Sequence, residues 1–176
     1  MKIYLNNYRG FGKNIIDTSN LLFLTGDNSS GKSSILNLVE YITKTKLENF
    51  VLFPDRYDAS RFDFFSPYKG NADVTLGFKS CEENDEHVRI TTIRKTTYGV
   101  AVIKKASFLS NGQFITATIS AKSIKIKIAK CDKSVSFEEY ITLHEKTTGF
   151  KTYVTSENPL VRSEERRVGK ECLRLC

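Results

Sequence analysis

The sequence predicts an α/β fold whose first part leads into an antiparallel β subdomain. An apolar run at residues 21–25 is followed by a segment rich in Gly and Ser and then by an amphipathic stretch at 32–46. From residue 73 onward, six segments rich in Val, Ile, Thr and aromatic residues are separated by short turn signals. Short links favour antiparallel hairpins, because parallel strands need long crossover connections.

The first elements are predicted from the local pattern. Residues 4–11 and 14–17 read as two strands of an N-terminal hairpin that turns at Gly10 or Gly12. The apolar run at 21–25 is typical of a strand that is buried on both faces, as in the middle of a parallel sheet. Residues 32–46 fit a helix with apolar positions at helical spacing, and Leu36 is expected to widen the apolar face that packs on a sheet; these positions are Ile35, Leu38, Val39 and Ile42.

The remainder is predicted to be mostly strands. Residues 48–71 read as an irregular packed connection with Pro54 and Pro67. We expect strands at 73–79, 87–94, 98–108, 114–129, 135–143 and 150–154. Within that part, 136–145 is the one segment that could instead be a helix. The predicted organisation is therefore a core at 1–47, a connection and β-rich subdomain at 48–161, and a tail at 162–176.

The tail has an unusual sequence. Residues 162–172, RSEERRVGKEC, resemble the translation of a common sequencing adapter. A charged C-terminal helix is the alternative reading of the same residues. We favour the adapter, and then expect a non-native tail, with the natural reading frame left near Val161 and continuing beyond it. The fold in this chain would then be incomplete.

Composition limits the class of protein. The chain has 176 residues, of which 40% are hydrophobic and 27% charged, in the range of soluble globular proteins. No apolar run is long enough to span a membrane, and polar residues interrupt the N-terminus too early for a signal peptide. We therefore expect a cytoplasmic protein. The cysteines match no zinc spacing and are expected to be reduced thiols; they are Cys81, Cys131, Cys172 and Cys176.

The formal net charge of +7 allows two interpretations. Lysines on solvated strand faces, such as Lys125 and Lys127, account for part of it. A basic surface can also attract nucleic acid by neutralising phosphates. Charge alone does not choose between them.

Residues 26–33 carry the clearest chemical motif, Gly-x-x-x-x-Gly-Lys-Ser. Gly26 and Gly31 let the backbone pass close to a phosphate, because no Cβ stands in the way. The amide groups of the loop then form an anion nest at the positive end of the following helix. Lys32 is expected to neutralise the β- and γ-phosphates, and the Ser33 hydroxyl to bind Mg²⁺. The motif therefore predicts a nucleoside triphosphate with magnesium.

The sequence does not identify the groups that hydrolysis requires. Hydrolysis needs a carboxylate on a second strand that holds Mg²⁺ and orients water, and no apolar run ending in Asp or Asp-Glu is present. His87 and His144 lack neighbouring ligand partners in the sequence and are expected to be solvated or packed rather than catalytic. Catalytic residues are thus not assigned.

The hairpin and the loop together resemble a known family. Tyr8-Arg9-Gly10-Phe11, a short hairpin and then residues 22–36 resemble ABC-class "AAA family ATPases". These are the head domains related to RecF, to structural-maintenance-of-chromosomes proteins and to overcoming-lysogenization-defect (OLD) nucleases. The family has Phe where this chain has Tyr8. The specific resemblance covers residues 1 to about 46 and implies the N-terminal half of a P-loop NTPase of the ABC class.

The resemblance also implies the cofactors, site residues and partners. ATP and Mg²⁺ would contact the loop and the start of the helix, and Arg9 would approach the nucleotide from the hairpin, although a surface arginine at a turn remains an equal alternative. The implied ATP-binding residues are Gly26, Asn28, Ser29, Ser30, Gly31, Lys32, Ser33, Ser34 and Arg9, with Ser33 on the metal. In the full-length parent, two heads would enclose ATP, and hydrolysis would drive action on DNA or on a partner nuclease.

Two other functions stay open. A small P-loop kinase acting on a metabolite has the same loop, but such kinases usually begin directly with the strand before it, and no arginine-rich lid is evident. A nucleotide-gated regulatory module that docks a partner through the β subdomain would need no hydrolytic residues. We expect the chain to bind Mg·ATP weakly without turning it over.

Overall fold

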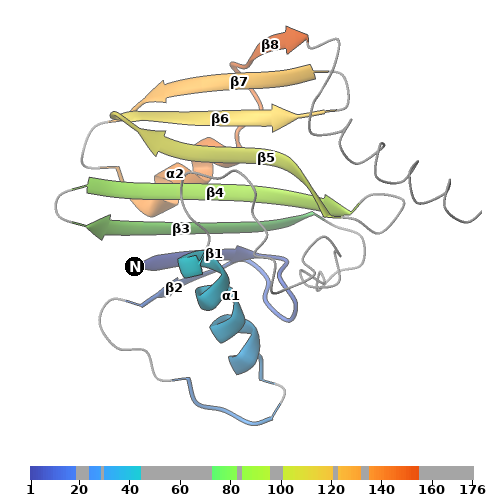
Figure 1. Cartoon of the computed structure of the whole chain (residues 1–176), viewed down its shortest axis with the longest axis vertical. Helices are drawn as coiled ribbons and strands as arrows, with labels where there is room; N and C mark the ends of the chain where they lie inside the picture. Colours follow the sequence, from blue (N-terminus) through green and yellow to red (C-terminus); the bar gives the residue numbers. More distant parts are fainter. Residues whose placement is uncertain are drawn as a thin grey trace, which may run out of the picture.

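The computed structural model describes residues 1–18, 24–28, 30–44, 73–82, 85–95, 101–120, 123–131 and 135–154. These residues form one eight-stranded sheet in the order β2-β1-β3-β4-β5-β6-β7-β8, with every neighbouring pair antiparallel (Figure 1). The strands are β1 (Lys2–Asn6), β2 (Asn14–Asp17), β3 (Val74–Glu82), β4 (Asp85–Lys95), β5 (Ala101–Ser110), β6 (Gln113–Ile119), β7 (Ser123–Lys130) and β8 (Lys151–Val154). The helices are α1 (Lys32–Lys44) and α2 (Phe137–Glu145).

One helix packs on each face of the sheet (Figure 1). Helix α1 buries Ile35 and Leu38 against β1, β3 and β4, in what we call the α1-side core. Helix α2 buries Phe137, Tyr140 and Ile141 against the opposite face, in the α2-side core. The antiparallel sheet is therefore the middle layer of an α/β/α arrangement.

Strand β1 contributes to both cores because successive side chains of a strand point to opposite faces. Ile3 and Leu5 belong to the α1-side core, and Tyr4 between them belongs to the α2-side core. All three side chains are fully buried. The N-terminal hairpin is thus joined to the β-rich part of the chain, since β1 also pairs with β3.

The predicted N-terminal elements are largely confirmed. Strands β1 and β2 form the expected antiparallel hairpin, and α1 begins at Lys32 as expected. The first strand was predicted at 4–11, but β1 ends at Asn6, and Tyr8 and Phe11 form only an isolated bridge around the turn. The expectation for Leu36 was wrong, because its side chain is 59% exposed and does not widen the buried face. Leu24 and Thr25 do not lie in a strand. Residues 21–23, 45–71 and 155–176 lie outside the described part, so the strand, the connection and the tail predicted there stay predictions.

The prediction of one strand at 114–129 was wrong. The chain forms two strands there, β6 and β7, which pair with each other. Ser120 directly follows β6 and Ser123 is the first residue of β7, and the Ser120 backbone N–H donates to the Ser123 carbonyl at 3.0 Å. The Ser120 hydroxyl donates to the same carbonyl at 2.8 Å and accepts from the Ser123 N–H at 3.1 Å. Serine hydroxyls make this connection without the Gly, Pro, Asn or Asp that usually marks a turn.

The strand prediction at 135–143 was also wrong, and the helix left open at 136–145 is the structure that forms. Ser136 and Glu139 form a capping box: the Ser136 hydroxyl accepts from the Glu139 N–H at 3.2 Å, and the Ser136 N–H donates to a Glu139 carboxylate oxygen at 2.7 Å. The buried residues of α2 recur at i, i+3, i+4 and i+7, which is the helical period; they are Phe137, Tyr140, Ile141 and His144.

Two further findings, on membrane-spanning helices and on cysteines, refer to the described part of the chain. Neither helix is both long enough and apolar enough to cross a bilayer. Cys81 and Cys131 form no disulfide bond in the described part of the chain, and their reduced state stays a prediction.

Candidate phosphate-binding site

The loop before α1 adopts the backbone that its glycines predict. Gly26 has φ +139° and Gly31 has φ +92°, values that residues with a side chain rarely adopt. Between them, the Ser30 N–H donates to the Asp27 carbonyl at 3.2 Å and closes a turn. The Ile35 N–H then donates to the Gly31 carbonyl at 3.1 Å, at the start of the helical pattern. The loop thus ends at the N-terminus of α1, where free amides and the helix dipole favour an anion.

Lys32 folds back over this loop. Its ammonium group donates to the carbonyl oxygens of Gly26 and Asp27, both at 2.6 Å, and lies 3.3 Å from the Ser30 hydroxyl. The first helical residue therefore places a positive charge over the beginning of the loop. An ammonium group is a strongly hydrated point charge with three donors, and it can exchange carbonyl contacts for phosphate oxygens without moving its helix.

Phe11 of the hairpin turn packs directly against the loop. A Cβ atom added at Gly31 would lie 2.7 Å from the Phe11 ring, closer than two carbon atoms can approach. Position 31 therefore requires glycine for two reasons, the positive φ and the close contact with the Phe11 ring. The hairpin motif identified in the sequence supports the loop through Phe11, a role that the sequence analysis did not assign. The spacing of the two motifs could not reveal which side chains meet.

Tyr8 and Arg9 connect the hairpin turn to the first turn of α1. The fully buried Tyr8 donates its hydroxyl hydrogen to the Ser34 carbonyl at 3.4 Å, and the Arg9 guanidinium donates to the Ser34 hydroxyl at 3.3 Å. Burial raises the pKa of Tyr8, and the nearby Arg9 charge opposes that increase. The turn is closed by the Phe11 N–H, which donates to the Tyr8 carbonyl at 2.8 Å. Arg9 itself has φ +48°, a conformation that costs a non-glycine residue about 1–2 kcal/mol.

The structure brings together most of the residues implied by the resemblance. Gly26, Ser30, Gly31 and Lys32 form the loop, and Arg9 contacts Ser34 one helical turn away. Asn28 and Ser33 are both exposed, and Ser29 lies outside the described residues.

Magnesium would have to share its ligands with a nucleotide at this loop. No group of three His, Cys, Asp or Glu that could hold a metal ion exists in the described part of the chain. Mg²⁺ usually keeps several waters and takes one or two protein oxygens together with phosphate oxygens. The exposed Ser33 hydroxyl next to Lys32 fits that limited role.

His144 is remote from this loop and is packed rather than solvated. Its side chain is 1% exposed, and its ring nitrogens lie 2.8 Å from the Thr92 hydroxyl and 2.7 Å from the Ser107 hydroxyl. Burial, and secondarily the charge of Lys105, lower the pKa of His144 to about 3. The packing role expected from the sequence is confirmed for this histidine.

A loop of this geometry, with a lysine at the first position of its helix, is typical of phosphate-binding α/β proteins. Comparison with protein families then gives the family. The model of the AAA ATPase domain family matches residues 1–167, nearly the whole chain. The chain belongs to this family. Searches of curated proteins and of solved structures found no match.

Proposed function

We propose that residues 26–34 bind the phosphates of Mg·ATP. The observation that carries this proposal is the position of the Lys32 ammonium group, 2.6 Å from two carbonyl oxygens at the beginning of a loop that ends at a helix N-terminus. Membership of the AAA ATPase domain family supports nucleotide binding. The loop backbone would surround the β-phosphate, and Lys32 would lie between the β- and γ-phosphates.

Two further side chains would complete the contacts of this chain. Ser33 would give its hydroxyl oxygen to Mg²⁺, which supplies charge neutralisation between the phosphates when it is bound. The Arg9 guanidinium already lies 3.3 Å from the Ser34 hydroxyl, one helical turn from the loop. From that position the Arg9 guanidinium would approach the nucleotide from the hairpin.

We further propose that the chain represents one half of an ABC-class site. The resemblance of the hairpin and loop to RecF-like, chromosome-maintenance and OLD-nuclease heads supports this subclass. In the full-length parent, a second head would close over the ATP, and hydrolysis would be coupled to DNA or to a partner nuclease. The carboxylates that hydrolysis needs are not identified in this chain, so we expect binding without turnover.

Calorimetric titration of the 176-residue chain with Mg·ATP tests the binding proposal. Lys32→Ala should weaken binding at least about tenfold, because it removes a charge-assisted contact to phosphate. Lys130→Ala is the matched control, since Lys130 is exposed on β7 and loses the same charge. Equal ATP affinity in wild type and Lys32→Ala would refute the role of the loop. Steady release of phosphate from ATP by this chain would refute the expectation of no turnover.

A further inference from the structure

A second polar site lies on the other face of the sheet, where α2 ends. It is a cavity of about 360 Å³, a size typical of small-molecule sites. None of its lining residues belongs to the loop at 26–34. Because α1 and α2 pack on opposite faces of the sheet, the two sites are separated by the sheet itself.

The floor of the cavity is one row of residues that crosses six strands. The strand register places each residue of this row directly opposite the next, and every side chain of the row is polar or charged. We call it the polar row; it consists of Asn6, Thr75, Thr92, Lys105, Thr118 and Lys125. The same register positions elsewhere on this face carry apolar core residues such as Ile90 and Phe114. The polar row thus borders the apolar part of this face, and the neighbouring residues Ser107 and Thr116 extend its polar character into the buried region.

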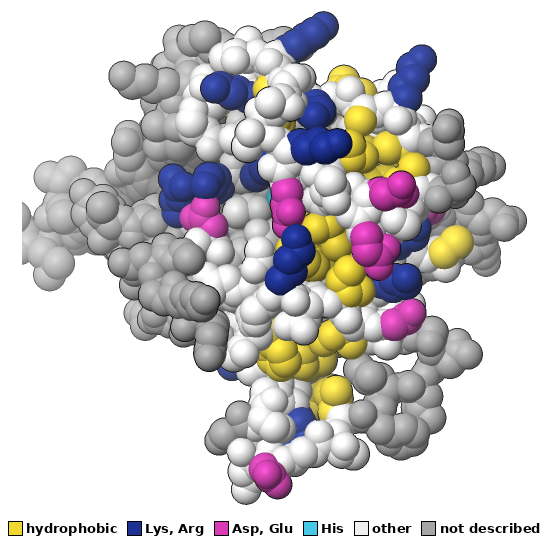
Figure 2. All heavy atoms as spheres, turned by 180° about the vertical axis from the view of Figure 1, so that it is seen from behind, with side chains coloured by type: hydrophobic (Ala, Val, Ile, Leu, Met, Phe, Trp, Pro, Cys, Tyr) yellow, Lys and Arg dark blue, Asp and Glu magenta, His cyan; other side chains and the backbone are white. Residues whose placement is uncertain are grey.

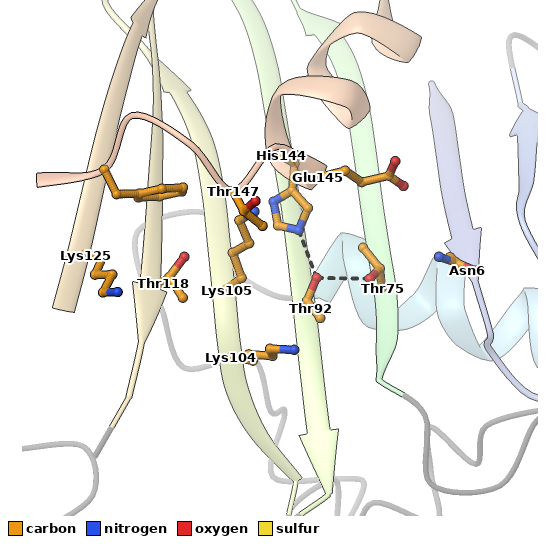
Figure 3. Close-up of a pocket in the computed structure, with 11 residues that line it drawn as sticks. Asn6, Thr75, Thr92, Lys104, Lys105, Thr118, Lys125, His144, Glu145 and Thr147 are labelled. Carbon is orange, nitrogen blue, oxygen red and sulfur yellow. Dashed lines mark hydrogen bonds between the residues drawn. The ribbon is translucent and has the colours of Figure 1, made fainter. Parts of the chain in front are cut away.

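The wall of the cavity comes from the C-terminal end of α2 and the segment after it (Figure 3). His144 holds this wall to the floor by its 2.8 Å hydrogen bond with Thr92, and Thr92 in turn lies 3.0 Å from the Thr75 hydroxyl. Figure 3 shows Lys105 extending from the floor toward Thr147, with Lys125 and Thr118 at the side away from His144. The hydroxyl network fixes the shape of the cavity before any ligand arrives.

Lysines dominate the charge of the cavity. Lys104, Lys105 and Lys125 all line it. A β-bulge brings the first two together: Thr92 pairs with Lys105 and Ile93 with Ile103, so Lys104 is an extra residue in β5 without an opposite partner. Figure 2, which shows the molecule from behind, has several Lys and Arg side chains in its upper part, at the end where β7 and β8 lie in Figure 1.

The nearby carboxylates offset only part of this charge, because Asp73 pairs with Lys104 and Glu145 pairs with Lys13 outside the cavity lining. Glu145 accepts from Lys13 at 3.1 Å and from the Tyr4 hydroxyl at 3.1 Å. Asp73 accepts from Lys104 at 2.6 Å and from Arg94 at 3.0 Å. In the described part of the chain, no carboxylate forms an ion pair with Lys105 or Lys125, the two lysines of the polar row.

Lys105 is affected by the neighbouring positive charges. Its ammonium group donates to the Lys146 carbonyl at 3.1 Å and lies 5.5 Å above the Phe150 ring. Burial, followed by the charges of Lys127 and Lys104, lowers the pKa of Lys105, and Glu145 only partly opposes this. An anion in the cavity would therefore be stabilised by a positive charge that the protein itself does not balance.

We propose that this cavity binds the phosphate group of a small phosphorylated compound. Lys105 and Lys125 would neutralise the two charges of a phosphate monoester, and the Thr118 hydroxyl between them in the register would donate to a phosphate oxygen. A carboxylate carries one charge and would leave one of the two lysines unbalanced. The aromatic ring of Phe150 lies at the wall for the apolar part of the compound.

The test uses the full chain with Lys32→Ala, so that the loop at 26–34 does not contribute. Inorganic phosphate and the monoester glycerol 3-phosphate are titrated separately by calorimetry, which distinguishes free phosphate from a phosphorylated compound as the preferred ligand. We expect saturable binding that Lys105→Met and Lys125→Met each weaken about tenfold, the loss of one charge-assisted contact. Lys130→Met is the control. Lys130 and Lys125 are an odd number of positions apart in β7, so their side chains point to opposite faces of the strand.

Two outcomes would overturn the proposal. One is the absence of saturable binding of either compound; the other is an equal loss in all three lysine variants, which would mean unspecific attraction by net charge. Lys125 is exposed, so Lys125→Met should fold even if Lys105→Met does not, and unchanged thermal melting confirms this. The result does not depend on whether the loop binds ATP, because that loop is altered in every sample.

Discussion

Acid should destabilise this protein through His144 in a way that one substitution removes. In the folded chain His144 is buried and neutral, and burial lowers its pKa to about 3 from the ordinary value of 6.5. The unfolded chain exposes the ring, which then binds a proton below about pH 6.5. The unfolded state therefore binds more protons between these two values. The free energy of unfolding must fall as the pH is lowered through this window.

The size of the effect follows from the two pKa values. Each pH unit below 6.5 lowers the free energy of unfolding by about 1.4 kcal/mol, until the folded state is itself protonated near pH 3. Lowering the pH from 7 to 5 should therefore remove about 2 kcal/mol through this histidine alone. A domain with a total stability of about 5–15 kcal/mol would show such a loss clearly.

The measurement is urea unfolding at pH 7 and pH 5, for the wild type and for His144→Gln. Glutamine does not titrate, and it can still hydrogen-bond the hydroxyls of Thr92 or Ser107. The carboxylates of the protein titrate in both chains, so their contribution cancels when the two pH differences are compared. The wild type should lose about 2 kcal/mol more than His144→Gln between the two pH values.

An equal loss of stability in the two chains would refute this reasoning. It would mean that His144 accepts a proton in the folded state, so that the network with Thr92 and Ser107 opens to water. A greater loss in His144→Gln would refute it more strongly, since that sign requires a stabilising positive charge at this position. The stability of His144→Gln at pH 7 is not itself a test, because it also includes a changed hydrogen bond.

Two further predictions concern the loop and the helix that follows it. Gly31→Ala should lower the free energy of unfolding by more than about 1 kcal/mol, because it combines a positive φ with a 2.7 Å approach to the Phe11 ring. In a Phe11→Ala chain the same substitution should cost less, and equal costs measured by urea unfolding in both backgrounds would show that the two residues do not touch. Leu38→Ala should cost about 2–5 kcal/mol, because this side chain is fully buried in the α1-side core. Leu36→Ala on the same helix should cost less than about 0.5 kcal/mol, because Leu36 is 59% exposed; similar midpoints for both variants would contradict the packing of α1.

The parts of the structure that could be predicted are those specified by local sequence. The hairpin at β1 and β2 and the start of α1 follow from residues within a few positions of each other. The backbone of the loop follows from Gly26 and Gly31, because positive φ values require glycine there. The signal for α2 was also local, since Ser136 and Glu139 have the spacing of a capping box. It was outweighed by the β-branched and aromatic residues of the same segment, which raise strand propensity.

The contacts of the loop could not be predicted, because they join segments that are distant in sequence. Phe11 meets Gly31 only once the hairpin is folded over α1, and Tyr8 reaches the Ser34 carbonyl in the same way. No spacing rule states which of several hairpin side chains will face the loop. The prediction for Leu36 failed for the same reason, because the residues of α1 that become buried depend on strands that are distant in sequence.

The polar row is the extreme case of such long-range dependence. Its members are spread from Asn6 to Lys125, and only the register of five strand pairings places them side by side. A shift of one residue in any pairing would turn the following strand over and send its lysine or threonine to the other face. The bulge at Lys104 acts in this way within β5, where it lets Ile103 pack in the α1-side core while Lys105 faces the cavity. Because of the bulge, Ile103 and Lys105 face opposite sides of the sheet although they are only two positions apart. Deletion of Lys104 would therefore remove either the apolar contact of Ile103 or the position of Lys105 in the cavity.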